Sequence, residues 1–334
     1  MNRNTIKIII LVIILLIIFS MVARAQQKID SLFSIKLEHH LISKGDHRPN
    51  FNPYRDSVDY FLYALHNGIS EKIFAEKADW DQEKLRSKTD LLINAGFLKR
   101  SNRGLLIPNV MIVTQKDGKS IYKESEKVAS EIADSIAVYL PKIKSAYTGI
   151  SFSEKFRFDQ VSFFLMSNVL LDNWQINNIE SQFVKDLRTL RHGKNYYYQI
   201  AELDENSDKE VFGIYGNQVQ CNDTICAAVY GNKRVGIQLK DYYADTSVPY
   251  LLPKDEDILK QMALGFLPAL LSIFERSRPF FLKIYKESTY NKEISFGEYF
   301  MWWYHFIYTR ATDLCGERKL IYIPQSGNFF YRGK

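Results

Sequence analysis

Residues 296–308 read FGEYFMWWYHFIY, and this stretch constrains the fold of the chain more than any other. Eight of its thirteen residues are aromatic, so a helix wound from it is apolar nearly all round. One face of that helix would carry Phe296, Tyr299, Phe300, Trp303 and Ile307. A helix with no polar face is usually buried at the centre of a protein. The stretch therefore predicts a central core helix.

The opposite face of the same helix carries Glu298, Trp302 and His305, at spacings of four and three residues. Trp302 would offer a flat apolar platform, and Glu298 and His305 would offer hydrogen bonds to a sugar or a peptide. We take these three as candidate ligand-binding residues, beside the simpler interpretation that the whole helix is core. The sequence indicates no catalytic residue.

The rest of the chain predicts an α+β fold that is mainly helical. Residues 26–55 form a polar arm rich in turn formers. Residues 56–125 show three short helices followed by hairpin signals. Residues 126–195 are expected to be mainly helical, because apolar side chains such as Val128 and Ile132 recur on one face.

Strand signals are concentrated in the second half. Residues 196–250 alternate with turn residues between them, which predicts an antiparallel β-meander inserted between helical segments. Residues 255–315 return to helix, and Leu320 to Ile323 is expected to form a final strand. We therefore expect a helical domain over residues 126–334 with the meander at 196–250.

A short region near the N-terminus has the pattern of a helix–turn–helix. Residues 74–85 read FAEKADWDQEKL and match the core of that motif, and residues 91–100, LLINAGFLKR, continue as a third helix and a first hairpin strand. Residues 56–108 thus resemble the winged-helix superfamily in its MarR/ArsR-like form, which makes 56–125 a winged-helix-like domain. Asp79 replaces the usual turn glycine, and Asp tolerates a left-handed backbone better than most residues.

The resemblance implies that the third helix reads DNA in the major groove. On that helix, one buried face is expected to hold five apolar residues: Leu85, Leu91, Leu92, Ile93 and Ala95. The opposite, exposed face carries a mixed set: Glu83, Arg86, Ser87, Asp90 and Asn94. Two carboxylates would meet phosphate oxygens unfavourably. We therefore expect a structural or protein-contact module, with nucleic acid an improbable partner.

The first 25 residues have the parts of a signal peptide. Arg3 and Lys7 precede a nearly pure apolar run from Ile8 to Val22, and Ala23 and Ala25 suit cleavage before Gln26. The alternative is an uncleaved inner-membrane anchor, although the run is shorter than the about 20 residues that span a bilayer. We expect a periplasmic or secreted protein that meets a membrane only if the leader stays attached.

The net charge of the chain does not indicate a nucleic-acid-binding surface. The chain carries 44 basic and 38 acidic side chains, a formal net charge of +6. The leader contains Arg3, Lys7 and Arg24 and no acidic residue, so half of this excess disappears if the leader is removed. The remaining excess is small for a chain of this length.

The three cysteines predict a disulfide. Cys221 and Cys226 flank Asn222-Asp223-Thr224-Ile225 between two strand-like runs, where a disulfide would staple a hairpin in an oxidising compartment. Cys315 lies in an apolar helix and is expected to be a buried thiol. No second cysteine pair or spaced histidine pair is present, so the sequence predicts neither a metal site nor a cofactor.

The enzyme signatures of hydrolases, zinc proteases and nucleotide-binding proteins are missing. The leading prediction is a non-enzymatic exported binding protein for a protein or a glycan. One alternative is a membrane-tethered regulator whose winged helix binds DNA. Another is a hydrolase of unfamiliar type that uses Glu298 and His305, which requires both residues in one deep pocket.

Overall fold

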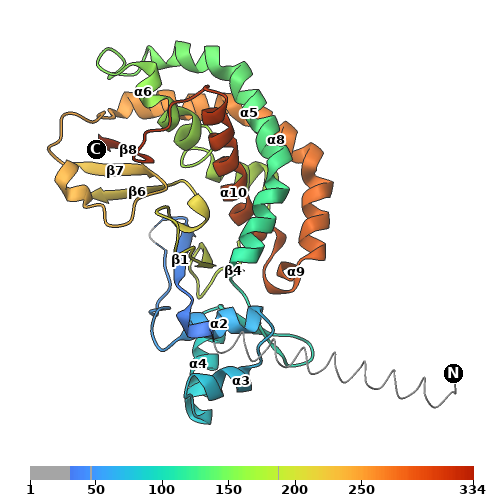
Figure 1. Ribbon diagram of the computed structural model, residues 1–334. Coiled ribbons are helices and arrows are strands. Elements are labelled where there is room, and N and C mark those ends of the chain that lie inside the picture. Colours follow the sequence, from blue (N-terminus) through green and yellow to red (C-terminus); the bar gives the residue numbers. More distant parts are fainter. Residues whose placement is uncertain (1–30, 46, 187) are drawn as a thin grey trace. The chain divides into compact units, whose positions relative to one another are not determined.

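The computed structural model describes residues 31–45, 47–186 and 188–334. It has an α+β fold, about 51% helical, with three small sheets (Figure 1), which confirms the α+β class that the sequence predicts. The leader predicted at residues 1–25 lies outside the described residues.

The chain forms two compact units and passes from one to the other three times, after Ile112, Arg188 and Glu202. Unit 1 is drawn from Met1–Ile112 and Thr189–Glu202, and unit 2 from Val113–Arg188 and Leu203–Lys334. The boundary expected at 125/126 therefore differs from the observed division. It lies inside a helix of unit 2, because Thr114 and Asp117 form a capping box that starts this helix at Gln115.

Three short helices and a hairpin follow one another in unit 1. Ser70 caps the second helix through the backbone N–H of Ile73, and Asp81 caps the third through that of Lys84. Phe61, Phe74 and Trp80 meet in the core with ring centroids 5.1–5.3 Å apart. The elements are α2 (Val58–His66), α3 (Glu71–Lys77), α4 (Gln82–Asn94), β2 (Leu98–Arg100) and β3 (Leu106–Pro108).

The turn between α3 and α4 has the left-handed residue that the sequence predicts. Asp79 has a φ of 52°, and the N–H of Trp80 donates to the carbonyl of Ala75 at 2.9 Å. On α4, Leu92 and Ala95 are buried as expected, whereas Leu91, also expected in the buried face, is 37% exposed.

The polar arm contains a strand that the sequence analysis missed. In the order β1-β5-β4, β1 (Leu37–Ser43) pairs antiparallel with β5 (Tyr196–Glu202), which lies beside β4 (Met111–Val113). Tyr196–Glu202 therefore belongs to this sheet and not to the predicted meander. The hydrophobic pattern marks each strand but carries no information on a partner so distant along the chain.

Unit 2 is built on long helices that lie side by side (Figure 1). The longest are α5 (Gln115–Tyr147), α8 (Pro253–Glu287) and α10 (Phe296–Glu317). Shorter segments complete the helical part: α6 (Phe158–Phe163), the π-helical η2 (Phe164–Val169), α7 (Ile176–Ile179), the π-helical η3 (Glu180–Val184) and α9 (Tyr290–Glu293). Among the described residues, α8 is the one helix long and apolar enough to cross a membrane by length and composition.

Helix α10 is the central core helix that its sequence predicts. Tyr299, Phe300, Trp303 and Ile307 are at most 1% exposed. Trp303 donates its indole N–H to the hydroxyl of Ser125 on α5 at 2.9 Å, so the one polar atom of this ring is satisfied inside the core. The aromatic stretch thus packs against both neighbouring long helices.

The sheet of unit 2 has the order β6-β7-β8. A hairpin joins β6 (Gly216–Cys221) to β7 (Cys226–Gly231), and β7 also pairs antiparallel with β8 (Asn328–Gly333). The final strand predicted at Leu320 to Ile323 is wrong. In that segment the N–H of Tyr322 donates to the hydroxyl of Ser162 at 2.9 Å and not to a neighbouring strand.

The predicted disulfide between Cys221 and Cys226 is confirmed. The two residues face each other at the end of the β6–β7 hairpin. Cys315 is buried, as predicted, and burial raises the pKa of its thiol to about 12.

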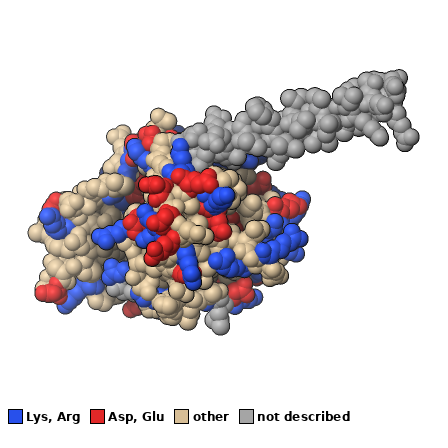
Figure 2. All heavy atoms as spheres, turned by 90° about the horizontal axis from the view of Figure 1, so that it is seen from below, with Lys and Arg blue, Asp and Glu red and all other residues tan. Residues whose placement is uncertain are grey.

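Charged side chains of both signs are interspersed on the face shown in Figure 2. This distribution agrees with a chain whose basic and acidic residues nearly balance.

Candidate functional site

Two hollows in unit 2 meet at Lys209 and Asp313, and we refer to them together as the groove. The larger hollow is about 950 Å³ and the smaller about 400 Å³. Their walls come from α5, α6, α10, the loop before β6 and the segment after α10. The groove is the candidate functional site because it combines space with convergent polar groups.

Asp313 lies on α10 where the two hollows join. Its carboxylate Oδ1 accepts a hydrogen bond from the phenol of Tyr215 at 2.9 Å. Burial raises the pKa of Asp313 above its ordinary value, while the bond from Tyr215 and the charge of Lys209 act in the opposite direction. Burial has the largest effect, so Asp313 holds its proton to a higher pH than an exposed aspartate does.

Three hydrogen bonds hold Tyr215 against α10. Besides the bond to Asp313, its N–H donates to the Thr309 hydroxyl at 3.2 Å, and its carbonyl accepts from the Tyr308 phenol at 2.6 Å. These bonds fix the position of the Tyr215 phenol, and therefore that of the Asp313 carboxylate.

The larger hollow carries balanced charge. It is lined by Lys144, Lys209 and Lys319 and by three acids: Asp159, Asp313 and Glu317. Arg310 holds Glu317 at 2.7 Å and also binds Glu126 of α5 at 2.7 Å. Because the positive and negative groups are equal in number, the hollow is not a binding site for a polyanion.

Apolar surface lies beside these charges. Tyr322 is 56% exposed, and Phe158 and Leu320 line the same hollow. Lys144 lies 5.4 Å from the centre of the Phe158 ring, a cation–π contact that keeps the ammonium over the wall.

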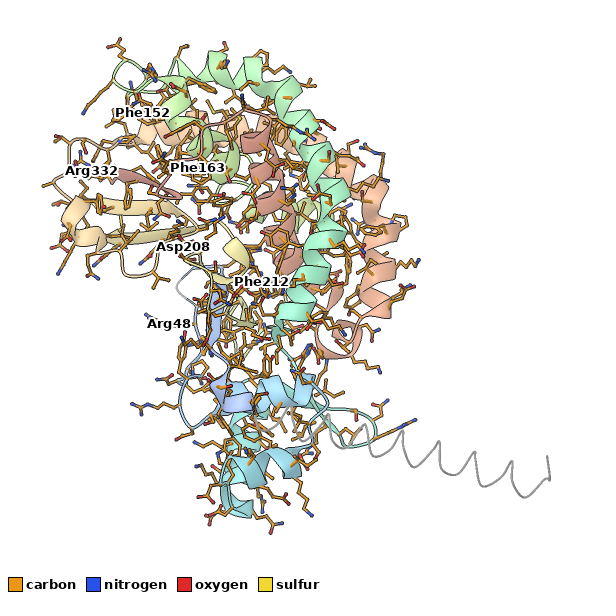
Figure 3. All side chains as sticks on the ribbon, in the orientation of Figure 1. Arg48, Phe152, Phe163, Asp208, Phe212 and Arg332 are labelled. Carbon is orange, nitrogen blue, oxygen red and sulfur yellow. A yellow bond between two sulfur atoms is a disulfide. The ribbon has the colours of Figure 1, made fainter. Side chains whose placement is uncertain are left out.

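Phe212 shapes the smaller hollow. Its backbone has a φ of 54°, which is unusual for a large side chain. Its ring lies beside the first turns of α5 (Figure 3), where a Cβ placed on Gly118 would come within 2.1 Å of it. Tyr122 donates its phenol O–H to the Phe212 carbonyl at 2.9 Å. Only glycine at position 118 leaves room for this arrangement.

The groove combines aromatic and aliphatic walls with carboxylates, ammonium groups and a tyrosine-bound acid. Such a surface suits a ligand with many hydroxyl groups and an apolar face, because hydroxyls bond to both carboxylates and ammonium groups.

The structure places the three predicted ligand-binding residues away from this groove. Glu298 and Trp302 are 5% and 3% exposed, and His305 is half-buried, with its Nδ1 2.8 Å from the carbonyl of Met301. Trp302 and His305 are in contact, with ring centroids 5.5 Å apart. Glu298 and Trp302 are buried, and the role of all three residues in binding stays a prediction. Neither hollow of the groove contains Glu298 or His305, so the groove gives no support to the hydrolase alternative.

A buried polar cluster surrounds Asp172, just beyond the π-helical segment η2. The charge on Asp172 acts on the buried phenols of Tyr230, Tyr304 and Tyr308. Burial raises the pKa of Asp172 to about 7, although Arg234 and Tyr308 act in the opposite direction. Within the described part of the chain, Asp172 Oδ2 has no hydrogen-bond partner. This cluster is enclosed, whereas the groove is open to ligands.

Unit 1 has its own buried polar contact. His39 Nδ1 lies 2.7 Å from the Tyr198 phenol, and its Nε2 lies 3.2 Å from Asp59 Oδ2. Tyr54 stacks on the imidazole with centroids 3.9 Å apart. Both imidazole nitrogens have partners, so this contact joins β1, β5 and α2 and is structural.

Comparisons with protein-family models, with curated proteins and with solved structures found no match for this chain. No sequence pattern predicts the groove, because its residues come from segments distant along the chain. The one local signal is the spacing of Asp313 and Glu317, which places both carboxylates on one face of α10.

Proposed function

We propose that this chain is an exported, non-enzymatic binding protein that holds a glycan in the groove. The observation that carries the proposal is the meeting of the two hollows at Asp313, between an exposed aromatic wall and balanced charges. A phosphorylated or sulfated ligand would need more cations than acids around it, and the larger hollow has equal numbers of the two.

Tyr322 and Asp313 have separate roles in this proposal. The ring of Tyr322 is 56% exposed and packs against the apolar face of a sugar ring. Asp313 is fixed by Tyr215 and receives or donates a hydrogen bond according to its protonation. Lys209 and Glu317 supply further hydrogen bonds on either side.

The test is a screen of neutral, amino and acidic oligosaccharides by saturation-transfer NMR with the purified protein. We expect binding of a neutral or amino sugar that Tyr322→Ala and Asp313→Asn each weaken by about tenfold, the loss of one good contact. Tyr54→Ala is the matched control, because Tyr54 is 62% exposed and lies in unit 1. Unchanged affinity in both groove variants would end the proposal.

The export of the chain rests on the leader sequence and is part of the same proposal. N-terminal sequencing of the protein from fractionated cells is expected to begin at Gln26. A chain that begins at Met1 in the membrane fraction would support the anchored alternative.

For unit 1 we propose a winged-helix-like module that makes a protein contact. The order of three helices and a hairpin, with Asp79 at the turn, supports this assignment. Each cation of α4 lies beside another side chain: Lys84 over the Trp80 ring, Arg86 3.9 Å from Asp90, and Lys88 2.5 Å from Asp56.

The exposed carboxylates of Glu83 and Asp90 beside Arg86 argue against the DNA-binding alternative, because carboxylates repel phosphate oxygens. The test is fluorescence anisotropy with mixed-sequence duplex DNA at low and physiological salt. We expect no binding tighter than about 100 μM at physiological salt, the weak end of non-specific affinity. Salt-dependent binding that Arg86→Ala abolishes would favour the regulator.

A further inference from the structure

Strand β6 is an edge strand whose outer side is unpaired among the described residues. Its one partner is β7. The opposite edge of the same sheet is covered, because Leu251 donates its N–H to the carbonyl of Arg332 at 2.7 Å, and Arg332 donates to that of Pro249 at 2.8 Å. The two edges of this sheet therefore differ, and β6 is the open one.

The register identifies the backbone groups that point outward. The N–H of Asn222 donates to the carbonyl of Ile225 at 3.0 Å, so the adjacent Cys221–Cys226 pair belongs to the non-hydrogen-bonded set. The short Cα–Cα distance of 4.0 Å in that pair agrees with this assignment. By alternation, the N–H and carbonyl groups of Asn217, Val219 and Cys221 face away from β7.

Edge strands are normally protected against pairing by charges, proline or a bulge. The sequence of β6, GNQVQC, has no charged residue and no proline, and its pairing with β7 is continuous from Gly216 to Cys221. The strand is also held in place at both ends: the disulfide fixes Cys221, and the hydrogen bonds of Tyr215 to α10 fix the start. Such a strand is ready to pair, because little conformational entropy is lost when it does.

We propose that β6 pairs antiparallel with β6 of a second copy of this chain, across a two-fold axis at Val219. In this register Asn217 of each copy faces Cys221 of the other, and the two Val219 residues face each other. All three outward residues then take part, which gives about six backbone hydrogen bonds.

A second copy fits this edge better than a charged partner strand. A two-fold axis places identical residues near one another, so any charge on the strand would repel itself. This strand carries none, and its central side chain is Val219, which is 51% exposed and would be covered by its counterpart. The proposal does not depend on the groove.

Strand pairing alone buries less than the about 1,000 Å² of a stable interface, so the dimer is expected to be concentration-dependent. Analytical ultracentrifugation tests the concentration dependence between about 10 μM and about 1 mM. The protein is purified in the form that the cell produces. We expect the apparent mass to rise toward twice the monomer. In hydrogen exchange, the amides of Asn217, Val219 and Cys221 should gain protection over the same range.

Two variants isolate the edge. Val219→Lys places two charges together at the axis and should keep the protein monomeric at all these concentrations. Val219→Pro removes an outward N–H that β7 does not use and should have the same effect. Val138→Lys is the matched control, because Val138 is 83% exposed on α5, and it should dimerise like the wild type. Thermal melting shows that each variant is folded.

If the variants do not fold, measurements on the wild-type protein alone can still overturn the proposal. A monomer at the highest concentration would do so, as would a dimer in which the three outward amides exchange as fast as in dilute solution. A dimer that survives Val219→Lys in a folded protein would place the interface elsewhere.

Discussion

The phenol of Tyr215 donates a hydrogen bond to the carboxylate of Asp313 at 2.9 Å, and this bond joins the sheet of unit 2 to its central helix. Tyr215 is the residue immediately before β6, and Asp313 lies on α10 at the junction of the two hollows. The contact therefore fixes both the start of the open edge strand and the acid at the centre of the groove.

Removal of this donor should raise the pKa of Asp313. Burial raises the pKa of Asp313, and the hydrogen bond from Tyr215 lowers it by stabilising the ionised carboxylate. In Tyr215→Phe the lowering contribution is lost, so the pKa rises. We expect a higher midpoint in a carbon-detected NMR titration of Asp313, and a loss of stability of about 1 kcal/mol. Tyr322→Phe, in the same hollow, is the control and should leave the midpoint unchanged. A lower midpoint in Tyr215→Phe would contradict the role given to this bond.

Asp172 should make the protein less stable as the pH rises. Its pKa is about 7 in the folded protein and 3.8 as an ordinary aspartate. Between these values the folded chain holds a proton that the unfolded chain has lost, so the free energy of unfolding falls with pH, by about 4 kcal/mol in total. Asp172→Asn should remove most of this fall.

Urea denaturation at pH 5 and at pH 8 measures the part of this fall that lies above pH 5, about 3 kcal/mol. Asp159→Asn is the matched control, because Asp159 is exposed and its pKa is lowered by the hydrogen bond from Arg157. The control should retain the fall that Asp172→Asn largely removes. If the free energy of unfolding falls equally between pH 5 and pH 8 in the wild type and in Asp172→Asn, Asp172 is already ionised in the folded protein at pH 5.

Substitution of Gly118 should displace Phe212. In Gly118→Ala the new Cβ would lie 2.1 Å from the Phe212 ring, so either the ring or α5 must move. Overpacking of this kind costs about 1–3 kcal/mol. Gly149→Ala is the control, since its Cβ would make an ordinary contact at 3.4 Å. In the Phe212→Ala background the cost of Gly118→Ala should nearly vanish, and an unchanged cost would place its origin elsewhere.

Local patterns predicted what depends on nearby residues. The aromatic stretch around Trp303 predicts a buried helix because apolar side chains cover nearly all sides of the helix within a few turns. The hairpin disulfide follows from two cysteines five residues apart, and the left-handed turn at Asp79 follows from the residue type. In each case the interacting groups are close along the chain.

The missed features depend on distant partners. Leu37 of the polar arm pairs with Glu202, and the side chains that line the groove with Asp313 come from four separate segments. A hydrophobic period shows which face of a helix or strand is buried but not what covers it. The same limit applies to Asp172, whose pKa depends on burial within the folded unit.

Asp79 should tolerate glycine but not a β-branched residue. Its φ of 52° is a left-handed conformation, in which a Cβ meets the following carbonyl. We expect Asp79→Val to destabilise unit 1 by about 1–2 kcal/mol, and Asp79→Gly to change stability by less than about 1 kcal/mol. The fluorine NMR signal of fluorotryptophan at Trp80, which is 6% exposed, reports the unfolding of this unit, because the other three tryptophans lie in unit 2. Equal stability of the valine and glycine variants would show that the turn is not left-handed in solution.

The disulfide should stabilise unit 2 modestly. Cys221 and Cys226 close a ring of few residues, which restricts the unfolded chain by about 2 kcal/mol. Reduction of the wild type, or the double change Cys221→Ser and Cys226→Ser, should lower the free energy of unfolding by this amount. The reductant should have no effect on the double variant, because Cys315 is buried and has no partner thiol among the described residues. An equal response of both proteins to the reductant would mean that its effect does not come from this bond.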